Sequence, residues 1–383
     1  MSDLQSKTLS LGGCDPEQLA VAGVQGLHPY QPGKPISELE REYGVSDVVK
    51  LASNENPFGV SPAAIAAMQA ELADLWLYPD GGGYSLRGKL AELHGCAPEC
   101  VTLGNGSNDV LALLAECFLE PGREAIFSQY CFAVYPIATQ AAGAQACVVP
   151  ANGLDHAQPL GHDLEAMAAA INERTALVFV ANPNNPTGTW LEEAELRRFL
   201  DKVPAHVIVV IDEAYHEYAL DRGAPDVSGW LAQYPNLVVS RTFSKAYGLA
   251  GVRVGYSVSS PAIAAVLNRL RQPFNVNSLA LAGAEAALAD QAFIRRSVQG
   301  NAEGMQQLKN GLDQLGLGYV DSACNFLLVN LERAADPVNE RLMQRGVIVR
   351  PVANYGLPEW LRVTIGTSDQ NERLLAALAE SLV

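Results

Sequence analysis

Positive charge is scarce in this sequence. Its 383 residues include 26 Lys and Arg against 42 Asp and Glu, so the formal net charge at pH 7 is −16. A surface this negative repels the phosphate backbone of nucleic acids, and we expect no nucleic-acid partner. If the ligand is itself an anion, a few arginines must be gathered locally to reverse the overall field.

Long hydrophobic runs and paired cysteines are also missing. No apolar run reaches the roughly 18 residues that a membrane span needs, so we expect no membrane partner. The opening residues, MSDLQSKTLS, lack the succession of basic, apolar and small residues of a secretory signal, which predicts a cytoplasmic protein. The seven cysteines, from Cys14 to Cys324, form no CxxC pair, which favours reduced structural thiols and no metal site.

Apolar residues are plentiful, at 49%, and charged residues make up 18%, a balance that builds a large core and is unlike that of disordered chains. The length exceeds the roughly 150 residues of one domain, so two domains or one enlarged domain are expected. We place an N-terminal arm with a short helix at residues 1–50, a large α/β domain at 51–277 and a small α+β domain at 278–383.

Short apolar runs alternate with amphipathic helical segments, as is typical of βαβ units. The runs 178–180 and 207–211 are continuously apolar, which indicates a mostly parallel sheet covered on both faces. The expected strands of the large domain are residues 101–103, 125–127, 146–149, 176–180, 207–211, 237–240 and 254–258. Those of the small domain lie near 326–331, 347–349 and 361–365, after a helical run that ends at Leu315.

In such sheets ligands bind beyond the carboxyl ends of the strands, so the residues after each run are candidates. Asp212 directly follows one run, where an unpaired carboxylate would be costly and needs a cation or strong donors; capping of the next helix is the alternative. Lys245, one of only seven lysines, follows another run. A desolvated lysine near a second cation becomes a Schiff-base nucleophile, and a surface lysine is the alternative.

Two loops complete the pattern. The prolines and glycine of NPNNPTG, residues 182–188, require a sharp turn, and GNGSN, residues 104–108, joins a strand to a helix whose N-terminus favours a phosphate. Each loop alone is a weak signal. Together, the four features match the needs of pyridoxal phosphate: a lysine for its aldehyde, a carboxylate for its ring nitrogen, donors for its phenolic oxygen and a cradle for its phosphate.

The order PNNPTG, DEAY and TFSKAYGLAGVRVGY resembles that of the fold-type I aminotransferases, specifically the histidinol-phosphate aminotransferase family. The resemblance covers nearly the whole chain, from LHPYQPGKP and KLASNENPFG to LRVTIGT. It implies a mostly parallel central sheet covered by helices and a pyridoxal phosphate cofactor bound as a Schiff base. The implied reaction moves an amino group between histidinol phosphate and 2-oxoglutarate, giving imidazole acetol phosphate and glutamate, in histidine biosynthesis.

Carried over residue by residue, the resemblance assigns Lys245 to the cofactor aldehyde and, as general base, to the Cα proton of the substrate. Asp212 would pair with the ring nitrogen, while Asn185 and Tyr215 would donate to the phenolic oxygen. Phe132 would stack on the ring. The cofactor phosphate would be held by Gly106, Ser107, Asn108, Thr242, Ser244 and Arg253.

The resemblance also implies the substrate contacts, which are Tyr30, Asn56, Arg350 and Arg362. The two arginines are the local cations that the charge argument required, and a guanidinium fork grips either a phosphate or a carboxylate. Tyr78, in WLYP, matches a tyrosine that reaches the phosphate of the neighbouring subunit's cofactor. A homodimer with shared active sites is therefore implied.

Two departures from the family pattern leave the substrate open. Asn108-Asp109 stands where Asp-Glu is frequent, and SQY at 128–130 precedes Phe132 where a Pro-led segment is frequent. The alternatives are an aromatic amino-acid (Phe or Tyr) aminotransferase, with or without dual activity, and a decarboxylase of a phosphorylated amino acid. A dinucleotide-binding dehydrogenase is disfavoured because Asp109 stands where its GxGxxG motif has the third glycine. A DNA-binding regulator is disfavoured because it would need a basic DNA-reading domain.

Overall fold

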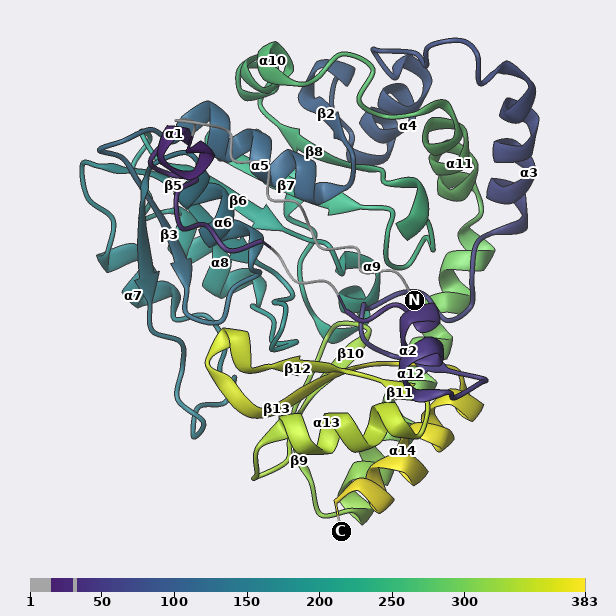
Figure 1. Cartoon of the computed structure of the whole chain (residues 1–383). Coiled ribbons are helices and arrows are strands. Elements are labelled where there is room, and N and C mark those ends of the chain that lie inside the picture. The colour runs from purple at the N-terminus through teal and green to yellow at the C-terminus, as the bar shows by residue number, and fades with distance from the viewer. Residues whose placement is uncertain (1–14, 30–32, 383) are drawn as a thin grey trace.

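A seven-stranded sheet forms the centre of the computed structural model, which describes residues 15–29 and 33–382 (Figure 1). The strand order is β2-β8-β7-β6-β5-β3-β4, and all neighbours are parallel except that β8 runs antiparallel to β2 and β7. The strands are β2 (Val101–Gly104), β3 (Glu124–Ser128), β4 (Gln145–Val149), β5 (Thr175–Ala181), β6 (Ile208–Asp212), β7 (Leu237–Thr242) and β8 (Gly255–Ser259). The predicted α/β class and all seven predicted strands of the large domain are confirmed.

Helices cover both faces of this sheet, which explains the continuously apolar runs. In β5, Leu177, Phe179 and Ala181 enter one buried cluster, while the alternate residues Val178 and Val180 enter another. The first cluster includes side chains of α5 (Ser107–Phe118), α6 (Val134–Ala141) and α10 (Pro261–Leu270). The second includes side chains of α7 (Leu164–Ala169) and α8 (Glu193–Leu200). With both faces buried, residues 176–181 of β5 are all apolar.

A smaller antiparallel sheet, of order β12-β13-β10-β9, lies below the large one in Figure 1. Its apolar face packs on three helices. These elements are β9 (Gly318–Val320), β10 (Phe326–Asn330), β12 (Arg350–Val352), β13 (Leu357–Thr364), α12 (Gln291–Gln314), α13 (Ala335–Gln344) and α14 (Ser368–Ser381). A parallel pair, β1 (Val49–Lys50) with β11 (Val347–Ile348), joins the end of the N-terminal arm to this unit.

The two long helices before the small sheet divide at Asp290, whose carboxylate accepts a hydrogen bond from the backbone of Phe293 (3.1 Å). Helix α11 (Ser278–Ala289) shares a buried cluster with α3 (Pro62–Glu71), α4 (Tyr84–His94), β2 and β8. Helix α12 begins in the same cluster and ends in the core of the small unit. The domain limits at 1–50, 51–277 and 278–383 stay a prediction.

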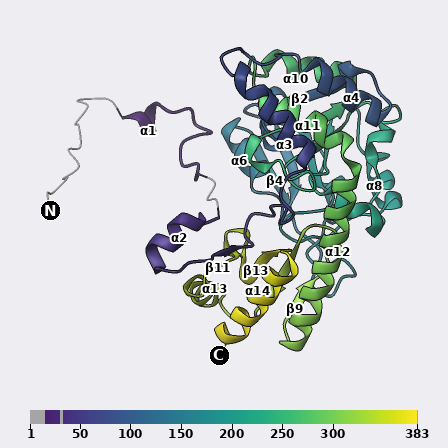
Figure 2. The same cartoon turned by 90° about the vertical axis from the view of Figure 1, so that its right-hand side faces the viewer.

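The N-terminal region contributes α1 (Pro16–Leu19) and α2 (Ile36–Tyr43), and the second is the short helix expected in the arm. Leu39 of α2 is buried against Ala52 and Ile348. Figure 2 shows α1 and α2 along one side of the molecule, apart from the central sheet. A one-turn helix, α9 (His216–Ala219), follows β6. Within the described ranges, no helix combines the length and apolarity needed to cross a membrane, and the six described cysteines are free.

Candidate active site

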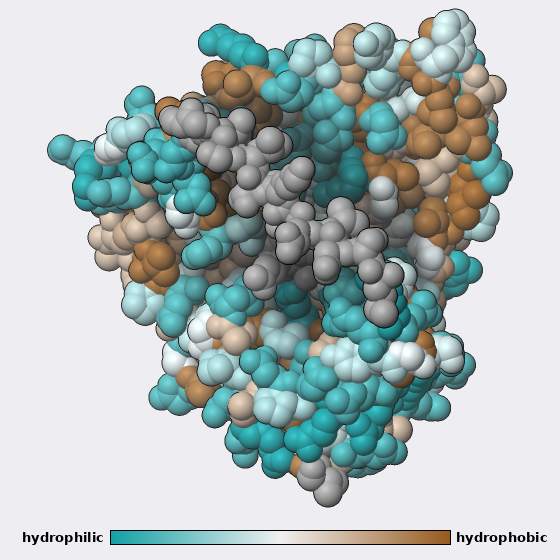
Figure 3. Space-filling model, in the orientation of Figure 1, coloured by the Kyte–Doolittle hydropathy of each residue, from teal (hydrophilic) through white to brown (hydrophobic). Residues whose placement is uncertain are grey.

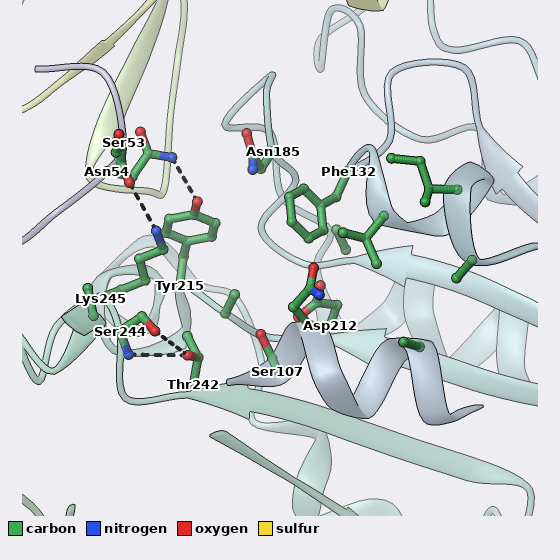
Figure 4. Close-up of a pocket in the computed structure, with 18 of the residues that line it drawn as sticks. Ser53, Asn54, Ser107, Phe132, Asn185, Asp212, Tyr215, Thr242, Ser244 and Lys245 are labelled. Carbon is green, nitrogen blue, oxygen red and sulfur yellow. Dashed lines mark hydrogen bonds between the residues drawn. The ribbon is translucent and has the colours of Figure 1, made fainter. Parts of the chain in front are cut away.

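A cavity of about 820 Å³ opens where the carboxyl ends of β5, β6 and β7 and the N-terminus of α5 face the small sheet. Parallel strands bring their following residues to one edge, which is why segments far apart in the sequence meet there. Figure 4 shows part of this lining. The predicted residues that line the cavity are Ser107, Asn108, Phe132, Asn185, Asp212, Tyr215, Thr242, Ser244, Lys245, Arg253, Arg350 and Arg362.

Lys245 lies just beyond the end of β7, on the same wall as Tyr215 (Figure 4). Its Nζ donates to the backbone oxygen of Ser53 (3.2 Å) and lies 5.7 Å from the centre of the Tyr215 ring. Burial, and then the positive charge of Arg362, lower the pKa of Lys245 to about 8. A substantial fraction of this amine is therefore neutral and nucleophilic near pH 8.

Asp212 is the last residue of β6, and its two carboxylate oxygens have different surroundings. Oδ2 accepts a hydrogen bond from the hydroxyl of Tyr135 (2.8 Å), whereas Oδ1 is buried without a partner among the described residues. Burial raises the pKa of Asp212 to about 6, against the opposing effect of the Tyr135 hydrogen bond. A buried carboxylate oxygen in this state offers a strong acceptor to a cationic N–H group.

Tyr215, Asn185 and Arg362 contribute further polar groups to the cavity. The hydroxyl of Tyr215 accepts from Asn54 Nδ2 (2.8 Å). Arg362 Nη1 donates to Asn185 Oδ1 (2.6 Å), and Arg362 Nη2 donates to the backbone oxygen of Ala52 (2.8 Å). Its Nε has no partner within the described part of the chain. Arg350 is the register partner of Arg362 across β12 and β13, so the small sheet brings two guanidinium groups to one cavity.

An anion cradle lies at the N-terminus of α5. The helix is twelve residues long, so its first backbone N–H groups and its dipole favour a negative ligand. Beside it, Thr242 Oγ1 accepts from the Ser244 backbone (3.1 Å), and Arg253 Nη1 donates to Ser244 Oγ (3.3 Å). Gly106 has φ +84°, and a Cβ there would overlap Arg253 Nη2. The positive φ favours glycine at this position, where a side chain would also displace the Arg253 guanidinium.

Two predicted residues, Asn56 and Tyr78, do not line the cavity. The amide of Asn56 donates to the backbone of Ala246 (2.9 Å) and to Ser297 Oγ (2.9 Å), and Asn56 is not part of the cavity lining. Tyr78 is 82% exposed, outside the cavity, with its ring stacked on Phe274 at 4.8 Å between ring centres. Tyr30 lies outside the described residues. The roles assigned to these three stay predictions.

Sequence reasoning missed two residues of the site. Asn54, which donates to Tyr215, lies two positions before the predicted Asn56, in the same NENP motif. The motif marks the segment, but the segment has no regular secondary structure that would tell which asparagine faces the cavity. Tyr135, which holds Asp212, lies in the first turn of an apolar helix, and no sequence signal separates it from a core aromatic residue.

A charged cluster next to the site has a structural role. Glu213, His216 and Asp226 each place one potential metal-ligand atom within 4.8 Å of the other two, a spacing that suits a metal ion. Arg241 Nη2, however, lies 2.7 Å from Glu213 Oε2 and 2.6 Å from Asp226 Oδ1. A guanidinium already supplies the positive charge that these carboxylates require.

The site fits pyridoxal phosphate. A partly neutral lysine suits its aldehyde, the unpaired Asp212 Oδ1 suits its protonated ring nitrogen, and the glycine-framed N-terminus of α5 suits its phosphate. The fold and these side chains together define an enzyme that binds a phosphorylated aldehyde through a lysine.

Comparison with known proteins identifies the family. The family model of class I and II aminotransferases matches residues 46–378. Histidinol-phosphate aminotransferase 2 of Pseudomonas fluorescens is 58% identical, over 95% of this chain and 97% of the relative, and that of Pseudomonas aeruginosa is 57% identical, over 95% and 98%. The chain belongs to the class I and II aminotransferases and is a pyridoxal-phosphate-dependent transaminase.

A solved structure gives the same fold. The crystal structure of histidinol-phosphate aminotransferase from Sinorhizobium meliloti, in complex with pyridoxal-5'-phosphate, has a TM-score of 0.86 and 29% identity to this chain. The match covers 94% of this chain and 97% of that one. These matches do not support the dehydrogenase or DNA-binding alternatives.

Proposed function

We propose that this transaminase moves the amino group of histidinol phosphate to 2-oxoglutarate, as a step of histidine biosynthesis. The proposal is supported by relatives of that name at 57–58% identity over nearly the full chain. The observation in the site that carries it is the cross-strand pair Arg350 and Arg362. These guanidinium groups form a cationic patch separate from the cradle at α5, so one cavity accepts a cofactor phosphate and a substrate anion together.

When bound, pyridoxal phosphate supplies an aldehyde that takes up the substrate's amino group and a ring that accepts the electron pair left at Cα. Lys245 Nζ would be the base that removes the Cα proton of the substrate and the acid that later returns a proton. Asp212 Oδ1 would accept a hydrogen bond from the protonated ring nitrogen. Asn185 and Tyr215 would donate to the phenolic oxygen, and Phe132 would pack on the ring face.

The remaining predicted residues hold the two anions. The cofactor phosphate is bound by Gly106, Ser107, Asn108, Thr242, Ser244 and Arg253. Arg362 and Arg350 bind the phosphate of histidinol phosphate in one half-reaction and the side-chain carboxylate of the glutamate pair in the other. Tyr30 and Asn56 keep their proposed substrate contacts, and the cytoplasmic location expected from the sequence stays a prediction.

We also propose a homodimer in which Tyr78 completes the neighbouring subunit's site. Tyr78 and Trp76 are 82% and 80% exposed, and Leu72, Leu75 and Leu77 beside them are more than half exposed. Figure 3 shows apolar side chains gathered at the edge of the molecule where α3 lies in Figure 1. An exposed apolar patch of this kind favours a protein partner, and a second copy of this chain is the partner that the proposal names.

The first experiment tests the lysine. The purified wild type should be yellow, its visible band should be bleached by borohydride, and Lys245→Ala should lose both the band and transamination. Lys202→Ala is the control, because Lys202 makes only a surface ion pair with Glu165, of little energetic weight. A colourless wild type that transaminates would refute the cofactor assignment.

The second experiment separates the substrate alternatives. We expect kcat/KM for histidinol phosphate to exceed the values for phenylalanine and tyrosine, because only the phosphate can engage both arginines as a dianion. A higher value for phenylalanine or tyrosine would support the aromatic alternative instead. Release of carbon dioxide from a phosphorylated amino acid without amino transfer would support the decarboxylase alternative.

A further inference from the structure

The Asp212 carboxylate is held by one side chain, Tyr135. The Tyr135 hydroxyl donates to Oδ2 at 2.8 Å, and Oδ1 is left for the cavity. Asp212 lines the cavity, whereas Tyr135 is fully buried behind it and does not line the cavity. Tyr135 therefore acts on bound molecules only through other residues.

Tyr135 is itself held tightly. Its ring stacks on Phe179, with 4.7 Å between ring centres and an angle of 8° between the planes. It also meets Phe132 edge-on, at 6.0 Å and 89°, and Phe127 at 6.5 Å and 48°. Because offset and edge-to-face aromatic contacts are geometrically specific, the phenol has one preferred place. The position of the hydroxyl is thereby fixed relative to β5 and β6.

We propose that Tyr135 is a positioning residue that turns the Asp212 carboxylate so that Oδ1 faces the ring nitrogen of the cofactor, and that supports Phe132 against the ring face. This inference rests on the proposed roles of Asp212 and Phe132. The residue at the ring nitrogen, Asp212, and the residue on the ring face, Phe132, would then both be positioned by the Tyr135 phenol.

The proton of Tyr135 has a defined place in this arrangement. Burial, and then the nearby Asp212 charge, raise the pKa of Tyr135 well above its usual value. The phenol therefore stays protonated and donates to Oδ2 over the whole working pH range. In Tyr135→Phe, Oδ2 would lose its side-chain donor, which favours the protonated acid over the carboxylate.

Tyr135→Phe tests the proposal, with Tyr234→Phe as the matched control. Tyr234 is also buried, and its hydroxyl also donates to an aspartate, Asp201 Oδ1, at 2.8 Å. Asp201 and Tyr234 do not line the cavity. The two variants thus lose the same kind of bond, and only one of them loses it at Asp212.

Four measurements are made: the thermal stability of the apoprotein, the dissociation constant of pyridoxal phosphate, the ring-nitrogen chemical shift of isotope-labelled cofactor in the holoprotein, and the kinetics of the glutamate half-reaction. For Tyr135→Phe we expect binding about tenfold weaker and a shift toward the unprotonated nitrogen. We also expect a fall in kcat for the glutamate half-reaction of about tenfold with KM little changed. Tyr234→Phe should match the wild type in all but stability.

An unchanged nitrogen shift and unchanged cofactor affinity in Tyr135→Phe would overturn the inference, even if stability falls. If Tyr135→Phe does not fold, Phe179→Leu loosens the phenol while keeping its hydroxyl, and the nitrogen shift should then move in the same direction by less. A wild type that does not bind pyridoxal phosphate would defeat the proposed function as a whole, and this result is distinguishable because the variants play no part in it.

Discussion

Lys245 is the residue whose surroundings most directly set the chemistry. Burial and the charge of Arg362 both disfavour its ammonium form, while the backbone oxygen of Ser53 accepts only one of its protons. The pKa of Lys245, about 8, lies well below that of an exposed lysine. The site thus produces a reactive amine at moderate pH.

This pKa predicts how cofactor uptake depends on pH. Only the neutral amine attacks an aldehyde, and a lowered pKa means that the neutral fraction grows as the pH rises through about 8. The rate at which apoprotein gains the visible band should therefore rise with pH and level off about one unit higher. Stopped-flow absorbance gives the rate, and a rate that falls over this interval would contradict the assignment.

At the residue scale, the sequence predicted the charged members of the site better than their supports. Lys245 and Asp212 stand out because a charged side chain close to the end of a buried apolar strand is costly unless it has a partner. Tyr135 and Asn54 do not stand out, because an aromatic residue in a helix and an asparagine in a loop both have ordinary structural explanations. Which oxygen of Asp212 is free depends on the packing of β6 against α6, which no local pattern encodes.

At the scale of elements, the phosphate cradle depends on the close approach of β8 to the N-terminus of α5. Gly255 is the first residue of β8 and pairs with Gly104 of β2 and Thr242 of β7. A Cβ at Gly255 would overlap Ser107 N and lie 2.5 Å from the carbonyl carbon of Gly106. The helix can keep its place only if this position has no side chain.

Gly255→Ala should therefore displace the start of α5. We expect pyridoxal phosphate to bind about tenfold or more weakly, and the unfolding temperature to fall by several degrees, since overpacking costs about 1–3 kcal/mol. Titration of apoprotein and calorimetry measure the two effects. Gly251→Ala is the control, because a Cβ there would meet nothing within 4 Å. If Gly255→Ala bound pyridoxal phosphate with wild-type affinity, the prediction would be wrong, because binding would then tolerate a shift of α5.

The elements themselves were predictable where burial on two faces imposes a continuous apolar run, as in β5 and β6. Both runs end at the edge of the cavity, so locating the runs in the sequence also located the site residues that follow them. The closeness of Gly255 to Gly106 was not predictable, because it joins residues 149 positions apart through an antiparallel strand inside a mostly parallel sheet. Strand order is a property of the assembled sheet, and periodicity does not reveal it.

At the scale of the whole molecule, the proposed shared site makes a prediction that no single subunit can satisfy. If Tyr78 acts in the partner's cavity, then a mixed dimer of Lys245→Ala and Tyr78→Ala chains has one site with both native residues. Coexpressed chains should regain about one quarter of wild-type activity, because half of the dimers are mixed and each has one intact site.

The matched control for this experiment pairs Lys245→Ala with Asp212→Asn. Lys245 and Asp212 line the same cavity of one chain, so each subunit of the mixed dimer would lack one of them and no activity should return. No recovery in the Tyr78 mixture would place Tyr78 in the site of its own subunit or outside catalysis, whereas recovery in the control would show that Lys245 and Asp212 do not act in the same site. Activity assays on the coexpressed mixtures give the answer.

The placement of the four tryptophans has a practical consequence. Trp76 is 80% exposed at the apolar edge, whereas Trp230 and Trp360 are buried and Trp190 is half-buried. Indole emission shifts to shorter wavelength as water is removed, so association through this edge changes chiefly the light from Trp76. The chain thus carries an intrinsic fluorescent reporter, through which subunit exchange can be followed without an added dye.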